Sequence, residues 1–165
     1  QIGVRYSVAD AVVESALQSY NRDDVPDILP YPDAIVTLDA ILTAGIRVSL
    51  VTTGRPTRQL AKIECLGLLR YFEPGRNVFI HEPAAGNPDK GSQMKVAIEA
   101  GLLTPAETAC IGDKLDADIR VGNRLGLTTV RIRKGRQRDT EPSTPEETPD
   151  FDLLELSQLP PILNI

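Results

Sequence analysis

Short apolar runs alternate along this chain with segments in which apolar residues recur at helical spacing. The helical segments, with an apolar residue at every third or fourth position, are Pro32–Thr43, Pro56–Leu66, Lys90–Ala100 and Asp116–Leu125. The apolar, β-rich runs are Ile46–Thr52, Asn77–His81, Thr108–Ile111 and Thr128–Arg133. Strands that alternate with helices through short glycine-marked turns predict right-handed βαβ units. The predicted fold class is α/β, with a Rossmann-like parallel sheet flanked by helices.

The two ends of the chain differ from this alternating middle. Ser7–Tyr20 has helical spacing with Ser7 as a capping residue, and a polar, proline-containing stretch follows it. We interpret residues 1–27 as the remnant of a helical cap and its linker, and residues 28–165 as the core domain. Arg133–Pro149 is charged and proline-rich, so we expect a long surface loop. The apolar residues after Asp150 predict a tail that docks on the core.

Composition limits the function before any motif is considered. The 165 residues suffice for one domain, and with 4% aromatic residues the core must be mainly aliphatic. A net charge of −5 argues against nucleic-acid binding. The sequence contains no apolar run long enough to span a membrane. Both cysteines, Cys65 and Cys110, lie in apolar stretches, which predicts reduced core thiols and a cytoplasmic protein.

Candidate chemistry lies where predicted strands end, because parallel α/β sheets bind ligands beyond the carboxyl ends of their strands. The first such end is Thr52, Thr53, Gly54 and Arg55. Hydroxyls, a glycine that lets a ligand approach the backbone, and free amides at a helix start suit a phosphate. The alternative is an ordinary strand-to-helix turn with a threonine cap. We predict that these four residues bind substrate.

The second strand end carries three carboxylates within six residues, Asp113, Asp116 and Asp118. A carboxylate just past an apolar strand gains nothing from burial unless it is paired or binds a metal ion. Oxygen ligands of this kind suit Mg²⁺. Asp116 is explained as a helix cap, whereas Asp113 and Asp118 are predicted to form the metal site. The alternative for Asp118 is a solvent-exposed helix residue.

A third candidate lies between the Asn77–His81 strand and the following helix. Lys90 stands at the predicted start of that helix, where a positive charge opposes the helix dipole. That placement makes sense if the ammonium neutralises phosphate or carboxylate charge, and the alternative is a solvated lysine. We predict a catalytic role for Lys90 and a substrate-binding role for Asn87 in the preceding loop.

The order of these elements, a threonine at a strand end, then a lysine, then Gly112-Asp113 with Asp118, resembles motifs II, III and IV of the haloacid dehalogenase superfamily. The similarity covers roughly residues 28 to 156, and each motif alone is weak. By this resemblance Thr52 and the following amides would bind the transferring phosphoryl group, and Lys90 would bridge phosphate and nucleophile. Asp113 would be a direct Mg²⁺ ligand, with Asp118 supporting the metal shell and positioning the lysine.

Two features depart from the family pattern. In one subgroup the lysine directly precedes Pro-Asp, a position that Asn87 holds here, so the role passes to Lys90. Motif I, an Asp-x-Asp after an apolar strand that supplies the nucleophile and the general acid/base, is absent. Asp39 is no substitute, because six residues before Ile46 are too few for a parallel crossover. We expect Asp39 on a helix.

In the family, the motif I strand lies between the strands that end at Thr52 and Ile111. Its absence would leave two rows of buried backbone groups unpaired, so we expect the natural protein to begin before Gln1. The predicted function is a Mg²⁺-dependent phosphatase acting on a small phosphorylated metabolite through an aspartyl-phosphate, with the nucleophile outside this chain. The alternative is an inactive binding or regulatory protein of the same fold. A dehalogenase would not need the acidic pair, and a phosphomutase stays open.

Two further sets of residues are predicted to be structural. His81, the only histidine, is interpreted as a solvated strand end. The basic residues at positions 131, 133, 134, 136 and 138 are followed by acidic residues and are interpreted as a solvated loop. The oligomeric state and the identity of the substrate are not readable from the sequence.

Overall fold

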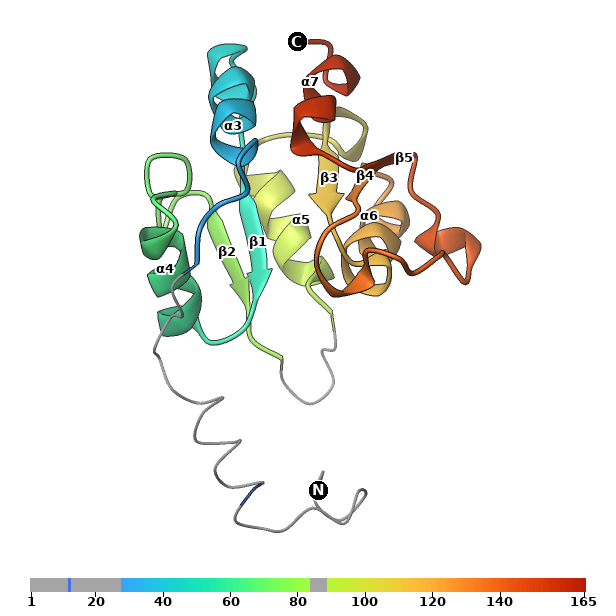
Figure 1. Ribbon diagram of the computed structural model, residues 1–165, viewed down its shortest axis with the longest axis horizontal. Coiled ribbons are helices and arrows are strands. Elements are labelled where there is room, and N and C mark those ends of the chain that lie inside the picture. The colour runs from blue at the N-terminus through green and yellow to red at the C-terminus, as the bar shows by residue number, and fades with distance from the viewer. Residues whose placement is uncertain (1–11, 13–27, 84–88) are drawn as a thin grey trace.

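The computed structural model describes residue 12 and residues 28–83 and 89–165 (Figure 1). The described helices are α3 (Ala34–Thr43), α4 (Pro56–Cys65), α5 (Gly91–Ala100), α6 (Arg120–Arg124) and α7 (Leu159–Ile162). The strands are β1 (Leu50–Thr53), β2 (Val78–His81), β3 (Ala109–Gly112), β4 (Thr128–Ile132) and β5 (Phe151–Leu153). The predicted cap remnant, Val12 excepted, and Asn87 lie outside the described residues. Among the helices described, none has the length and apolar character to cross a membrane.

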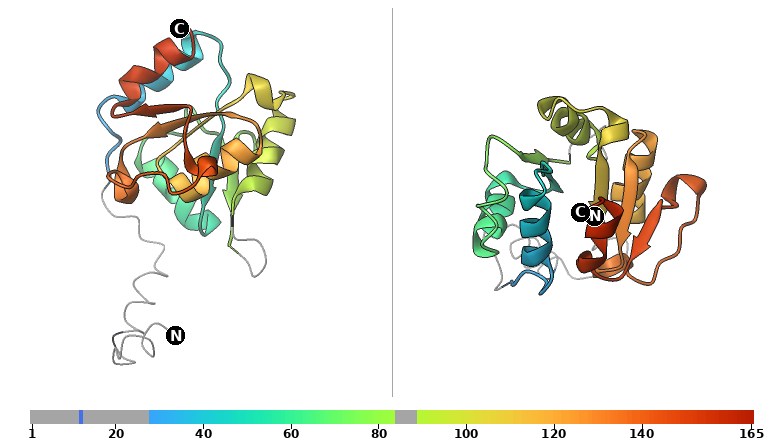
Figure 2. Two further views of the ribbon diagram at one scale, coloured as in Figure 1. Left: turned by 90° about the vertical axis from the view of Figure 1, so that its right-hand side faces the viewer. Right: turned by 90° about the horizontal axis from the view of Figure 1, so that it is seen from above.

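The strands form two parallel sheets. β1 pairs with β2, with Leu50 opposite Val78, and β4 lies between β3 and β5 in a three-stranded sheet. The arrows of β1, β2 and β3 point the same way in Figure 1. Figure 2 shows β1 and β2 with α3 and α4 on one side of the molecule, and the chain from β3 onward on the other. The predicted α/β class with a parallel sheet is confirmed.

A cleft separates the two sheets. Among the described strands, none pairs with both β1 and β3, so each has an edge that faces the other without a ladder between them. A cavity of about 670 Å³ lies there, lined by residues of α3, β1, α5, β3 and α7. Ile111 in β3 is 40% exposed, which is unusual for an isoleucine in a strand. The described sheet is thus split at the place where the sequence predicts a missing strand.

Two apolar clusters are buried in the described part of the chain, and the first joins α3 to β4 and α7. One is formed by Ile41, Val130, Ile132 and Leu159, and the other by Ile63, Tyr71 and Phe72. Asp39 lies in α3, as predicted, and its carboxylate accepts a hydrogen bond of 2.6 Å from the Tyr71 hydroxyl. Its role is therefore to join α3 to the segment after α4.

Some predicted boundaries are wrong for a physical reason. The strand predicted from Ile46 begins at Leu50, because β2 offers partners only from Val78 onward. The helix predicted over Asp116–Leu125 is a π-turn, Leu115–Ile119, followed by α6. β5 was expected only as a docking tail, and its pairing with β4 was missed. The start of β1 and the existence of β5 depend on pairing partners that are distant in sequence.

The two cysteines differ in their surroundings. Cys65 is exposed at the end of α4, so its predicted place in the core is wrong. The helix turns the preceding Ile63 inward and leaves Cys65 outside. Cys110 lies on β3, where burial first and the charge of Asp118 second raise the pKa of its thiol to about 12. Both cysteines are free thiols.

This contrast predicts selective alkylation. Because the thiolate is the reactive form, a pKa of about 12 leaves Cys110 with a thiolate fraction about a thousandfold below that of an ordinary cysteine at pH 8. Iodoacetamide should modify Cys65 while Cys110 stays a thiol, as peptide mass spectrometry would show. In denaturant both should react. Equal rates in the folded protein would contradict the burial of Cys110.

Candidate phosphate and metal site

Lys90 joins the ends of the two sheets. It directly precedes α5, and its ammonium lies 2.5 Å from Asp118 Oδ1 and donates to the carbonyl oxygen of Val51 at 3.3 Å. The Lys90 and Asp118 side chains are 15% and 6% exposed. The contact with Oδ1 is an ion pair without the alignment of a hydrogen bond. The lysine predicted as solvated in the alternative interpretation is therefore partly buried between β1 and the turn after β3.

The turn after β3 is held by the other oxygen of Asp118. Asp118 Oδ2 accepts hydrogen bonds from the amides of Asp113 at 3.1 Å and Lys114 at 3.0 Å. Gly112 permits this approach, because a Cβ built on it would lie 2.4 Å from the Asp118 side chain. Asp118 is therefore buried, and its alternative as a solvent-exposed helix residue does not hold. The buried Leu115 and Ile119 fix the turn to the core.

Asp113 presents the carboxylate that suits a cation. Partial burial first, and the neighbouring charge of Asp118 second, raise its pKa above the ordinary value. A divalent cation bound by Asp113 would relieve both effects, so this donor fits Mg²⁺. Both oxygens of Asp118 are already engaged, which fits a positioning role better than direct ligation. Among the described residues there is no cluster of three or more metal-ligating side chains.

The turn after β1 brings the predicted phosphate-binding residues to the same end of the sheet. Thr52 Oγ1 donates to Gln59 Oε1 at 3.1 Å, and Gln59 Nε2 donates to the Thr53 carbonyl at 3.2 Å. Gly54 has a φ of 143°, which requires glycine, and its amide donates to the His81 carbonyl. The Gly54 amide is therefore already hydrogen-bonded within the fold. The exposed Arg55 follows it and leads into α4. Sequence analysis gave Gln59 no role, although its spacing from Thr52 across one turn is a usable signal.

Two predictions about single residues are wrong. His81 is 2% exposed, because α5 packs against β2, and is therefore no solvated strand end. Arg131 is completely buried on β4, where the carbonyls of the following loop surround its guanidinium. An arginine inside the strand sequence TTVRI was the signal that it does not belong to a solvated basic loop.

Comparisons with known proteins show what the chain is similar to. The model of the HAD-hydrolase-like family matches residues 84–159. A glyceraldehyde 3-phosphate phosphatase of Methanopyrus kandleri is 34% identical over 142 residues, which are 86% of this chain and 60% of the relative. A phosphoserine phosphatase of Thermus thermophilus is 28% identical over 129 residues, 78% of this chain and 49% of the relative.

Solved structures show the same likeness. A HAD phosphatase from Thermococcus onnurineus superimposes with a TM-score of 0.64 and 27% identity, covering 81% of this chain and 57% of that one. This chain spans 60% of the Methanopyrus relative's length. The matched region holds the turn after β3, with Asp113 and Asp118, and Lys90 before α5. Over the matched residues the chain is similar to haloacid dehalogenase-like hydrolases.

Proposed function

We propose that this chain is the core of a Mg²⁺-dependent phosphohydrolase that acts on a small phosphorylated metabolite. The observation that carries the proposal is the placement of Lys90 between the end of β1 and Asp118. In this proposal one positive charge and two carboxylates, together with a threonine-rich turn, form one site where β1 and β3 end on the two sides of the cleft. Relatives named as phosphatases of glyceraldehyde 3-phosphate and phosphoserine support a small substrate.

The residues of this chain would act by position and charge. The Lys90 ammonium would neutralise the charge of a phosphoryl oxygen. Asp118 would hold that ammonium in place. The Thr52 hydroxyl, which donates to Gln59 Oε1 here, would turn its hydrogen to a second phosphoryl oxygen, with Thr53, Gly54 and Arg55 forming the rest of the turn. Asn87 stays a predicted substrate contact. Phosphoryl transfer depends strongly on this kind of positioning and charge neutralisation.

Asp113 would hold the cation. When bound, Mg²⁺ would supply the positive charge that stabilises the transferring phosphoryl group. Asp118 would keep the Asp113 backbone fixed through its bonds to the Asp113 and Lys114 amides. The raised pKa of Asp113 supports this assignment, because burial and the charge of Asp118 disfavour its charged form more than the nearby Lys114 and Lys90 favour it.

We further propose that the nucleophile belongs to a strand that fills the cleft between β1 and β3. The cleft is lined by apolar residues of both sheets along most of its length, and by Lys90 and Asp118 at one end. A parallel strand there would pair with both free edges. A carboxylate at its carboxyl end would then lie next to Lys90 and Asp113. Attack by that carboxylate on phosphorus would form the aspartyl-phosphate and break the phosphate ester bond, so that the metabolite leaves as its alcohol after taking up a proton. Water would then hydrolyse the aspartyl-phosphate to inorganic phosphate and the free carboxylate.

The metal assignment predicts the effect of Asp113→Asn on the protein expressed with the strand that carries the nucleophile. Loss of a ligand that supports several kcal/mol of charge stabilisation should lower Mg²⁺-dependent hydrolysis of p-nitrophenyl phosphate on the order of a thousandfold. Chelation of Mg²⁺ should lower the wild-type rate comparably.

Asp116→Asn is the matched control for this prediction. Asp116 lies in the same turn but is exposed, and its Oδ1 accepts a bond from Gln137 that asparagine can also accept. Its activity should stay near the wild-type value. If Asp113→Asn left the rate unchanged, the metal assignment would be wrong.

The cleft predicts what the reading frame encodes upstream of Gln1. It should contain an apolar strand that ends in Asp-x-Asp, and the chain extended by this strand should unfold at a higher temperature than residues 1–165, because the two free edges become paired. Phosphatase activity should appear only in the extended chain. A start codon just before Gln1, with no such strand, would instead support an inactive binding or regulatory protein.

A further inference from the structure

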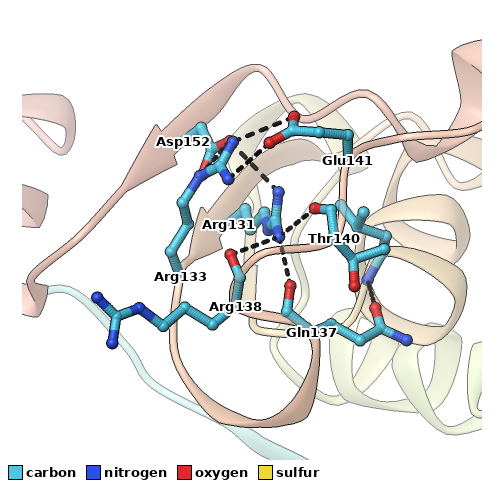
Figure 3. A network of polar contacts seen from close by, with 8 residues as sticks. Arg131, Arg133, Gln137, Arg138, Thr140, Glu141 and Asp152 are labelled. Atoms are coloured by element: carbon cyan, nitrogen blue, oxygen red, sulfur yellow. Dashed lines mark hydrogen bonds and ion pairs between the residues drawn. The ribbon is translucent and has the colours of Figure 1, made fainter.

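The buried guanidinium of Arg131 organises the loop that follows β4. Its Nη2 donates to the carbonyl oxygens of Gln137 at 2.6 Å, Thr140 at 2.7 Å and Arg138 at 3.3 Å, while Nη1 lies 3.5 Å from Asp152 Oδ2 (Figure 3). The Arg131 side chain has no exposed surface. A buried charge is tolerated only with such partners, so the loop cannot move away without leaving the guanidinium unsatisfied.

The loop held in this way reaches back to the turn after β3. Gln137 Oε1 accepts a hydrogen bond of 2.7 Å from the amide of Leu115, and its Nε2 donates to Asp116 Oδ1 at 2.8 Å. Gly135 has a φ of 65°, and a Cβ built on it would lie 2.3 Å from Asp113 Oδ2. The loop therefore lies directly against the Asp113 carboxylate and requires glycine there.

Three successive amides of the turn are fixed by side chains from two directions. Asp118 accepts from the amides of Asp113 and Lys114, and Gln137 accepts from the next one. Asp118 belongs to the turn itself, whereas Gln137 comes from a segment 22 residues later in the chain. Without Gln137, the Leu115 amide would lose its hydrogen-bond acceptor, and this part of the turn, next to Asp113, would be held by the packing of the buried Leu115 side chain alone.

We propose that Gln137, held in place by Arg131, is a positioning residue that sets the Asp113 turn for Mg²⁺. The inference rests on the proposed function of Asp113 as the cation ligand. Gln137 contacts neither cation nor substrate, and acts through the Leu115 amide. Neighbours that orient a metal ligand typically change metal affinity by about 10- to 100-fold when removed.

Gln137→Ala tests this proposal in the 165-residue chain. Amide hydrogen exchange, measured by NMR without metal, should become at least about tenfold faster at Leu115, because the bond that protects this amide is lost. Titration with Mg²⁺ alone, followed by the Asp113 amide shift, should give a Kd about 10-fold or more above the wild-type value. Faster exchange at Leu115 together with weaker Mg²⁺ binding would indicate the loss of a local hydrogen bond. A general loss of stability would speed exchange throughout the chain.

Gln158→Ala is the matched control. Gln158 Oε1, like Gln137 Oε1, accepts hydrogen bonds from the backbone. Its donors are the amides of Leu154 and Glu155, in a turn that packs on α3. This variant should leave Leu115 exchange and the Mg²⁺ affinity unchanged. Equal Mg²⁺ affinity in Gln137→Ala and wild type would overturn the positioning role alone. A wild-type chain whose Asp113 shift does not respond to Mg²⁺ would instead overturn the proposed metal function.

Discussion

The ion pair between Lys90 and Asp118 is the contact on which the rest of the site depends. Lys90 also bonds the Val51 carbonyl, so its ammonium links the end of β1 to the turn after β3 across the cleft. A buried pair of this kind contributes little net stability, but removal of one partner costs about 3–5 kcal/mol because the other charge is left buried. Its value here is geometric: it fixes a positive charge at the rim of two sheets.

Asp118 couples this charge to the backbone of the turn. One carboxylate oxygen faces Lys90 and the other receives two amide bonds, so the position of the ammonium and the path of residues 113–115 depend on one another. Asp113, which has no such role in the turn, is left as the carboxylate whose charge is only partly compensated, because burial and Asp118 outweigh Lys114 and Lys90. The different roles proposed for Asp113 and Asp118 follow from their different hydrogen bonds. Their spacing in the sequence alone did not distinguish the two residues.

The sequence allowed prediction of those features that depend on local pattern. The parallel strands, the position of Asp113 after β3 and the helical place of Asp39 all follow from periodicity and crossover length. Arg131, His81 and Cys65 were misjudged, because their burial depends on which distant segments cover them. Gln137 gave no signal at all, since its partner lies 22 residues away and a surface glutamine in a charged loop is unremarkable in sequence.

The open cleft limits which segment can complete the sheet and where a reactive residue of that segment can lie. Its walls are mainly apolar, with Ile111 left 40% exposed, and Lys90 and Asp118 are among its charged lining residues. A segment that fills it must be largely apolar to cover these walls, and must be a strand to satisfy the backbone groups on both edges. A polar residue of such a segment is best placed beside Lys90 and Asp118. The packing of this fold therefore calls for an apolar strand in the cleft. The proposed chemistry calls for a reactive carboxylate at the end of that strand.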